Sequence, residues 1–146
     1  MKIGIPTETS AHETRVAATP ETVRKSASQG HGVNVQRGAG ALASYPDDAY
    51  AAAGAELVDA PAAFGADLVL KVRSPADTEL PLLKRGAVLV GMHDPFDTRN
   101  ASKLAAAGIT AFALEAAPRT TRAQSLDVLS SQANIAGTNW SRRAST

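Results

Sequence analysis

In Asp67-Leu68-Val69-Leu70-Lys71-Val72, apolar side chains occupy both faces of any strand that the run forms. Short apolar runs of this kind, bounded by glycine, proline or charge, are typical of a parallel sheet covered on both sides. Similar runs predict five more strands, over Lys2–Ile5, Gly32–Gln36, Ala55–Val58, Ala87–Gly91 and Thr110–Leu114.

Helix signals lie between the predicted strands. Thr19-Pro20-Glu21 supplies a cap, a proline at the first helical position and an acid in the first turn, and Gly30 follows the far end. Three further helices are predicted at Tyr45–Gly54, after Ser74-Pro75-Ala76-Asp77, and from Asp97 or Thr98 to Gly108. The alternation predicts an α/β fold, with a doubly wound, mostly parallel sheet and helices on both faces, Rossmann- or flavodoxin-like.

The composition is that of an ordinary globular protein. The chain has 146 residues, of which 44% are hydrophobic and 20% charged, and its net charge is +1. That charge gives no reason to expect nucleic acid as a partner. No apolar run approaches the roughly 20 residues of a membrane span, and no signal peptide is recognisable, so a cytoplasmic location is expected. With 4% aromatic residues we expect an aliphatic core, and with no cysteine and no ligand spacing we expect no metal site.

One glycine-rich turn invites two interpretations. Gly38-Ala39-Gly40-Ala41-Leu42-Ala43 follows a predicted strand and fits G-x-G-x-x-(G/A), and Asp59 lies about 20 residues on, where a ribose-binding acid would be. However, the best helix start comes later, at Pro46, and glycine-rich turns after strands are common for steric reasons alone. We favour the steric interpretation.

Polar side chains follow several predicted strands. In open α/β sheets the carboxyl ends of the strands line the ligand crevice, so Arg15 and Lys71 are candidates to hold a carboxylate or phosphate, or are simply paired surface charges. His93 and Asp94 form either an acid/base pair or a turn that begins at Asp94-Pro95. His12 and His31 are expected to be bystanders.

The polar passage Pro118–Gly137 is the strongest functional signal. Gln124, Asp127 and Ser130 are three residues apart and share roughly one helical face, with Arg119 just upstream. Such donors and acceptors suit a ribose or a carboxamide. An elaborate helix cap would explain one or two of these groups but not all of them.

Pro118–Gly137, with the pattern PRxxRAQSxDxLSSQANIAG, resembles the N-terminal domain of the alpha subunit of proton-translocating NAD(P) transhydrogenase. Several shorter motifs resemble both that family and alanine dehydrogenase; they are Lys2–Glu8, Glu13–Pro20, Arg37–Gly40, Ala53–Ala55 and Leu70–Val72. The resemblance implies a chain that takes part in hydride transfer between NAD(H) and NADP(H) coupled to proton movement.

For individual residues the resemblance implies more specific roles. Arg119, Gln124, Asp127 and Ser130 match the positions that contact the nicotinamide end of NAD(H) in the family. The family's glycine fingerprint belongs to a second domain and is not the turn at residues 38–43.

In alanine dehydrogenase, the positions that match Arg15 and Lys71 hold the substrate carboxylate and carbonyl beside a catalytic histidine. The resemblance puts Asp94 nearer than His93 to that histidine's position, which argues against amino-acid dehydrogenase chemistry.

The resemblance stops at Gly137. We therefore expect an alanine dehydrogenase/transhydrogenase N-terminal domain over residues 1–137 and a divergent, disordered tail over 138–146, as a truncation or frameshift would produce. The chain alone is expected to bind NAD(H) weakly or not at all and to be inactive. Other transhydrogenase subunits or domains are the implied partners, and a homodimer is possible. We expect no direct insertion of this chain into the membrane. The alternatives are a non-catalytic interaction module and a 2-oxo acid binding domain like that of alanine dehydrogenase.

Overall fold

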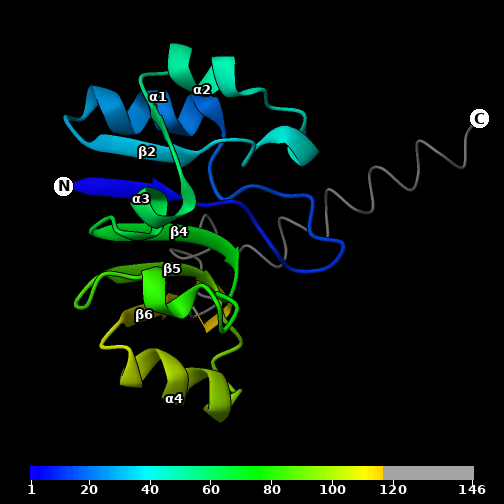
Figure 1. The fold of residues 1–146 in the computed structure, drawn as a ribbon, viewed down its shortest axis with the longest axis vertical. Helices are drawn as coiled ribbons and strands as arrows, with labels where there is room; N and C mark the ends of the chain where they lie inside the picture. Colours follow the sequence, from blue (N-terminus) through cyan, green and yellow to red (C-terminus); the bar gives the residue numbers. More distant parts are fainter. Residues whose placement is uncertain (117–146) are drawn as a thin grey trace, which may run out of the picture.

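A single parallel sheet organises the protein (Figure 1). The structure, a computed structural model, describes residues 1–116. Its strands run in the order β3-β2-β1-β4-β5-β6, and every neighbouring pair is parallel. Their bounds are β1 Lys2–Ile5, β2 Gly32–Gln36, β3 Glu56–Val58, β4 Leu68–Arg73, β5 Val88–Met92 and β6 Thr110–Ala113. Each predicted strand is found within one residue at either end, and the predicted fold class is confirmed.

The described residues also form four α-helices and three 3₁₀ turns, which lie between the strands except for η3, which follows β6. They are α1 Pro20–Ser28, η1 Ala41–Ala43, α2 Asp47–Ala52, α3 Ala60–Phe64, η2 Leu80–Leu82, α4 Thr98–Ala106 and η3 Leu114–Ala116. The cap predicted at Thr19 forms, and the helix predicted to begin at Asp97 or Thr98 is capped by Asp97. The Thr19 side chain accepts a hydrogen bond from Thr22 N, and Asp97 accepts from Arg99 N and Asn100 N. Within residues 1–116, none of these helices has both the length and the apolar character to cross a bilayer.

One predicted helix did not form, and one observed helix was not predicted. After Ser74-Pro75-Ala76-Asp77 only the 3₁₀ turn η2 forms, with Pro81 inside it. Proline cannot donate the backbone hydrogen bond that would continue a helix through this segment. In contrast, α3 was not predicted, although Asp59 caps it through Ala62 N, because it has only five residues and gives no periodic pattern.

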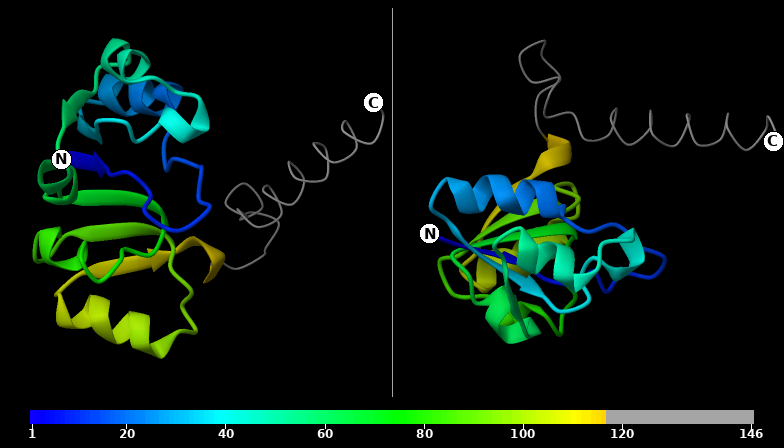
Figure 2. Two further views of the ribbon diagram at one scale, coloured as in Figure 1. Left: turned by 45° about the vertical axis from the view of Figure 1, so that its right-hand side comes forward. Right: turned by 90° about the horizontal axis from the view of Figure 1, so that it is seen from above.

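The helices cover the sheet from both faces (Figure 2). Val23 of α1 and Tyr50 of α2 pack with Ile5, Val33 and Val35 in one core cluster. A second cluster joins α3 and α4 to β4 and β5 and contains Phe64, Val69, Leu83, Leu89, Leu104 and Ile109. The expectation of a purely aliphatic core was wrong, because Tyr50 and Phe64 are the largest fully buried side chains. The Tyr50 hydroxyl donates to Ala18 O at 2.9 Å, which satisfies its polar group.

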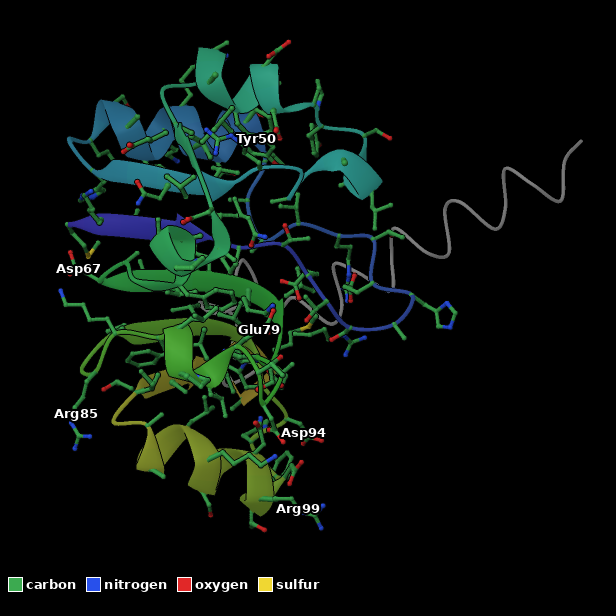
Figure 3. The ribbon with its side chains drawn as sticks, in the orientation of Figure 1. Tyr50, Asp67, Glu79, Arg85, Asp94 and Arg99 are labelled. Carbon is green, nitrogen blue, oxygen red and sulfur yellow. The ribbon has the colours of Figure 1, made fainter. Side chains whose placement is uncertain are left out.

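The strand order reverses between β1 and β4. The chain leaves β1 towards β2 on one side, whereas it leaves β4 towards β5 on the other. At such a switch point the loops after the two strands diverge and open a crevice at the carboxyl ends. Figure 3 shows Glu79, Asp94 and Arg99 on this side of the sheet, and Asp67 and Arg85 on the opposite side.

Candidate functional site

A buried lysine lies between two buried carboxylates at the switch point. The Lys71 side chain is only 1% exposed, and its Nζ lies 3.6 Å from Glu8 Oε2 and 3.3 Å from Glu79 Oε2. The ammonium is also 5.6 Å from the centroid of the Phe64 ring. Burial of an ammonium group without partners would be unfavourable, and the two carboxylates and the aromatic face stabilise the charge of Lys71 here.

The two carboxylates also tie the loops together. Glu8, just after β1, accepts hydrogen bonds from Val72 N at 2.6 Å and Arg73 N at 3.2 Å. Glu79 accepts from Ala76 N at 2.8 Å and from the Thr9 hydroxyl at 3.1 Å. The loop after β1 is thus fixed to the end of β4 and to the η2 segment.

Arg15 belongs to a second ionic cluster. Its Nη2 lies 2.7 Å from Glu13 Oε2, and Arg73 Nε lies 3.1 Å from the same oxygen. The side-chain hydrogen bond from Arg15 is the main reason that the pKa of Glu13 falls to about 2, and the same bond raises the pKa of Arg15. The two predicted cations, Arg15 and Lys71, are therefore held by different carboxylates.

An apolar groove adjoins both clusters. A cavity of about 450 Å³ is lined by Arg15 and Lys71 and by apolar side chains from the first loop, β4, β5 and η3; these are Val16, Ala17, Leu70, Val72, Val90, Met92 and Leu114. The structure thus brings Arg15 and Lys71 to one groove. The ammonium of Lys71, however, is already engaged by Glu8 and Glu79.

His93 and Asp94 do not form a pair. His93 is 3% exposed, and neither of its ring nitrogens has a hydrogen-bond partner among residues 1–116. Burial lowers the pKa of His93, and the charge of Lys71 lowers it further, against an opposing effect of Glu115. Asp94 is exposed, and its carbonyl accepts from Asp97 N at 3.0 Å. The structure forms the turn, and His93 is the buried member.

All buried side-chain polar atoms without a hydrogen-bond partner in the described part of the chain follow strand ends. They are Thr7 Oγ1 after β1, both ring nitrogens of His93 after β5, and Glu115 Oε2 after β6. Buried polar groups in proteins are nearly always satisfied by protein, water or ligand. The carboxyl ends of the strands are therefore the part of the described structure with the most buried polar atoms that still require a hydrogen-bond partner.

The glycine-rich turn at residues 38–43 does not form a phosphate cradle. A side chain at Gly40 would collide with Tyr45 O at 2.7 Å and with the Tyr50 ring at 2.6 Å, so packing accounts for this glycine. The amide of Gly38 is taken by Asp47 Oδ1 at 2.8 Å, and Asp59 caps α3. These residues therefore do not fit the diphosphate and ribose of a dinucleotide, and the steric interpretation accounts for the turn.

The sequence analysis did not select several residues of the site. Two partners of the cations, Glu13 and Glu79, carry no pattern that distinguishes them from surface acids. The third, Glu8, had a usable signal, because it lies three residues after the predicted strand Lys2–Ile5. His12 is exposed, and no group of metal-ligating residues gathers within residues 1–116.

Four predicted residues lie outside the described part of the chain. They are the nicotinamide-side candidates Arg119, Gln124, Asp127 and Ser130. Their assignment stays a prediction.

Comparison with known proteins gives a consistent picture. Residues 4–136 match the family described as "Alanine dehydrogenase/PNT, N-terminal domain". The chain is 42% identical to "NAD(P) transhydrogenase subunit alpha" of Haemophilus influenzae, over 94% of this chain and 27% of that protein. A crystal structure of transhydrogenase from Sinorhizobium meliloti superposes with a TM-score of 0.90 at 45% identity, over 94% of this chain and 42% of that one.

Alanine dehydrogenases are more distant relatives. That of Bacillus subtilis is 34% identical over 94% of this chain and 36% of its own length. The chain spans only 27% to 38% of the length of the transhydrogenase alpha relatives it matches.

Proposed function

Because the chain belongs to the alanine dehydrogenase/PNT N-terminal domain family, we propose that it serves as the N-terminal portion of an NAD(P) transhydrogenase alpha subunit. The observation that carries this proposal is the difference in similarity, 42% identity to a transhydrogenase alpha subunit against 34% to an alanine dehydrogenase. The domain extends over residues 1–137 in this proposal and acts on the cytoplasmic side of the membrane.

The chain's contribution is positional. NAD(H) would supply the hydride chemistry, and Arg119, Gln124, Asp127 and Ser130 would hold its nicotinamide side. The described residues support this division, since the turn at 38–43 offers no place for a diphosphate. The chain alone is therefore proposed to bind NAD(H) weakly and to require other transhydrogenase subunits or domains for turnover.

Half-molecules of the cofactor test this proposal. The full chain should bind reduced nicotinamide mononucleotide in preference to AMP, measured by saturation-transfer NMR. Asp127→Asn should weaken the nicotinamide signal, whereas Asp48→Asn, in the first turn of α2, should leave it unchanged. Preferential binding of AMP, or a Kd for NADH on the order of micromolar, would contradict the assignment.

A second candidate function is binding of a 2-oxo acid. It is favoured by the alanine dehydrogenase relatives, by Lys71 and the buried His93 at the carboxyl ends of β4 and β5, and by Arg15 in the loop after β1. The ion pairs with Glu13, Glu8 and Glu79 oppose it, because both cations are already neutralised. Pyruvate should raise the melting temperature if this function is present, and acetate serves as the control. No difference between the two would remove this candidate.

A further inference from the structure

The strands β5 and β6 each lead into an ionisable side chain that the proposed function does not use. Gly91 of β5 pairs in register with Ala113 of β6. His93 lies two residues after Gly91, and Glu115 lies two residues after Ala113. Residues at equal spacing from a paired position project to the same face of a sheet. The strand pairing therefore favours a histidine beside a glutamate where the two strands end.

A hydrogen bond beyond the strands holds the glutamate at this place. Glu115 Oε1 accepts from Asp94 N at 2.6 Å. That amide belongs to the peptide bond between His93 and Asp94, so the carboxylate lies against the backbone that carries the imidazole ring. His93 and Glu115 also line one cavity of about 420 Å³ at the carboxyl ends of the strands. The two side chains thus share one enclosed space.

The atoms that could join these two side chains have no partner. Both ring nitrogens of His93 and Oε2 of Glu115 are buried without a hydrogen bond within residues 1–116. A carboxylate oxygen only accepts, whereas a protonated imidazole donates from both nitrogens. Hydrogen bonds between charged partners are shorter and stronger than neutral ones. A protonated His93 ring is therefore the donor that matches Glu115 Oε2.

The histidine occupies a prepared position. Its ring lies over Gly91, where an added Cβ would come within 2.9 Å of the ring carbon Cε1. Asn100 Nδ2 donates to His93 O at 2.8 Å and to Ser74 Oγ at 2.7 Å, which fixes the backbone of His93 to α4 and to the loop after β4. The backbone is thus fully engaged, while the ring nitrogens are left for another purpose.

Charged groups surround the ring from every neighbouring element. Burial and the charge of Lys71 on β4 lower the pKa of His93, whereas the charge of Glu115 raises it. The ammonium of Lys71 is itself paired with Glu8 and Glu79. The other charged residues that line the shared cavity are Arg73 and Asp77 after β4, Asp94 and Asp97 after β5, and Arg99 and Lys103 of α4. Acids and bases are equal in number among these, so Glu115 is the carboxylate whose charge acts specifically on the ring.

We propose that His93 and Glu115 form a proton-dependent latch, in which a protonated His93 ring donates to Glu115 Oε2 and joins the end of β5 to η3. This inference goes beyond the proposed function and does not depend on it. The closed latch would bind one carboxylate to both the ring of His93 and the amide of Asp94. Because histidine changes its charge between mildly acidic and neutral pH, the latch closes as the pH falls.

NMR of the full chain, with carboxyl and imidazole groups labelled, tests the proposal. In the parent protein the Glu115 Cδ resonance should change with the same pH midpoint as the His93 ring, because protonation of the ring alters the surroundings of its partner. Glu21, an exposed acid in the first turn of α1, should show no inflection at that midpoint. His93→Gln identifies the ring signal and should remove the inflection from Glu115.

A pair of matched variants separates a specific partner from the general charge of the cavity. Glu115→Gln removes the charge but keeps an oxygen that can accept from Asp94 N. It should shift the His93 midpoint to lower pH, because the protonated ring loses its partner. Asp94→Asn removes the same charge from an exposed neighbour and should shift the midpoint less. The exposed His12 serves as a reference in every sample.

Two results would overturn the proposal. If the Glu115 resonance of the folded parent shows no inflection at the His93 midpoint, the two groups do not pair. If Glu115→Gln and Asp94→Asn shift that midpoint equally, the ring responds to the overall charge of the cavity and not to Glu115. The first measurement needs no substitution, so it decides the question even where a variant fails to fold, which circular dichroism would reveal.

Discussion

Replacing Lys71 by methionine should destabilise the protein far more than the same replacement at Lys84. Lys71 is 1% exposed and lies between Glu8 and Glu79, whose side chains are 2% and 9% exposed. Removing the ammonium group leaves two buried carboxylates without an opposite charge. Breaking a buried ion pair in this way lowers the free energy of unfolding by about 3–5 kcal/mol. With a urea m-value of about 2 kcal/mol per molar, the unfolding midpoint should fall by roughly 1.5–2.5 M.

Lys84 provides the matched control. Its Nζ lies 2.8 Å from Asp67 Oδ1, closer than either contact of Lys71, but its side chain is 58% exposed. Solvent screens such a pair, so Lys84→Met should unfold near the parent's midpoint. Urea titrations of both variants followed by circular dichroism measure the difference. Equal shifts, or a larger shift for Lys84→Met, would refute the reasoning that burial rather than distance determines the effect.

Three further predictions concern the same edge of the sheet. The pKa of Glu13 falls from 4.5 to about 2 on folding, so the stability that its ionised carboxylate contributes is complete above pH 4.5 and is lost as the pH drops towards 2. The difference in melting temperature between the parent and Glu13→Gln should therefore shrink over that range. A difference that stays constant would contradict this prediction. Burial lowers the pKa of His93, so an NMR titration of its ring should give a midpoint below 6.5, and the free energy of unfolding should fall as the pH drops below 6.5. A midpoint above 6.5 would show that the ring is not desolvated. A methyl group at Gly91 would meet the Lys71 carbonyl oxygen and the His93 ring, so Gly91→Ala should lower the free energy of unfolding in urea by about 1–3 kcal/mol. Gly32→Ala should leave that free energy unchanged, because the nearest neighbour of a methyl group there is 3.7 Å away. Similar losses for the two variants would count against close packing at Gly91.

The sheet could be predicted from sequence because each strand carries its own signal. Val69 and Leu89 alternate with Leu70 and Val90, so the strands are apolar on both faces and stand out from the polar connections. The caps at Thr19 and Asp97 are equally local. The α3 helix was missed because five residues are too few to establish a helical period.

The site could be predicted only to a limited extent. Position at strand ends selected Arg15 and Lys71, and both line the groove. Their partners could not be assigned, because the backbone contacts of Glu8 join residues 64 and 65 positions apart. Such pairs depend on which strands become neighbours, and a single sequence does not encode that in any short pattern.

The central place of β1 bears on the synthesis of the chain by the ribosome. Ile3 pairs with Val33 on one side and with Leu68 on the other, so one edge of β1 can be satisfied long before the second. The β1–β2 pair is complete once β2 has been made, and at about 5–20 residues per second the roughly 32 residues from Gln36 to Leu68 take about 2 to 6 seconds to translate. During that time the nascent β1–β2 pair presents an open strand edge, which is where a chaperone, or another nascent chain, would bind first.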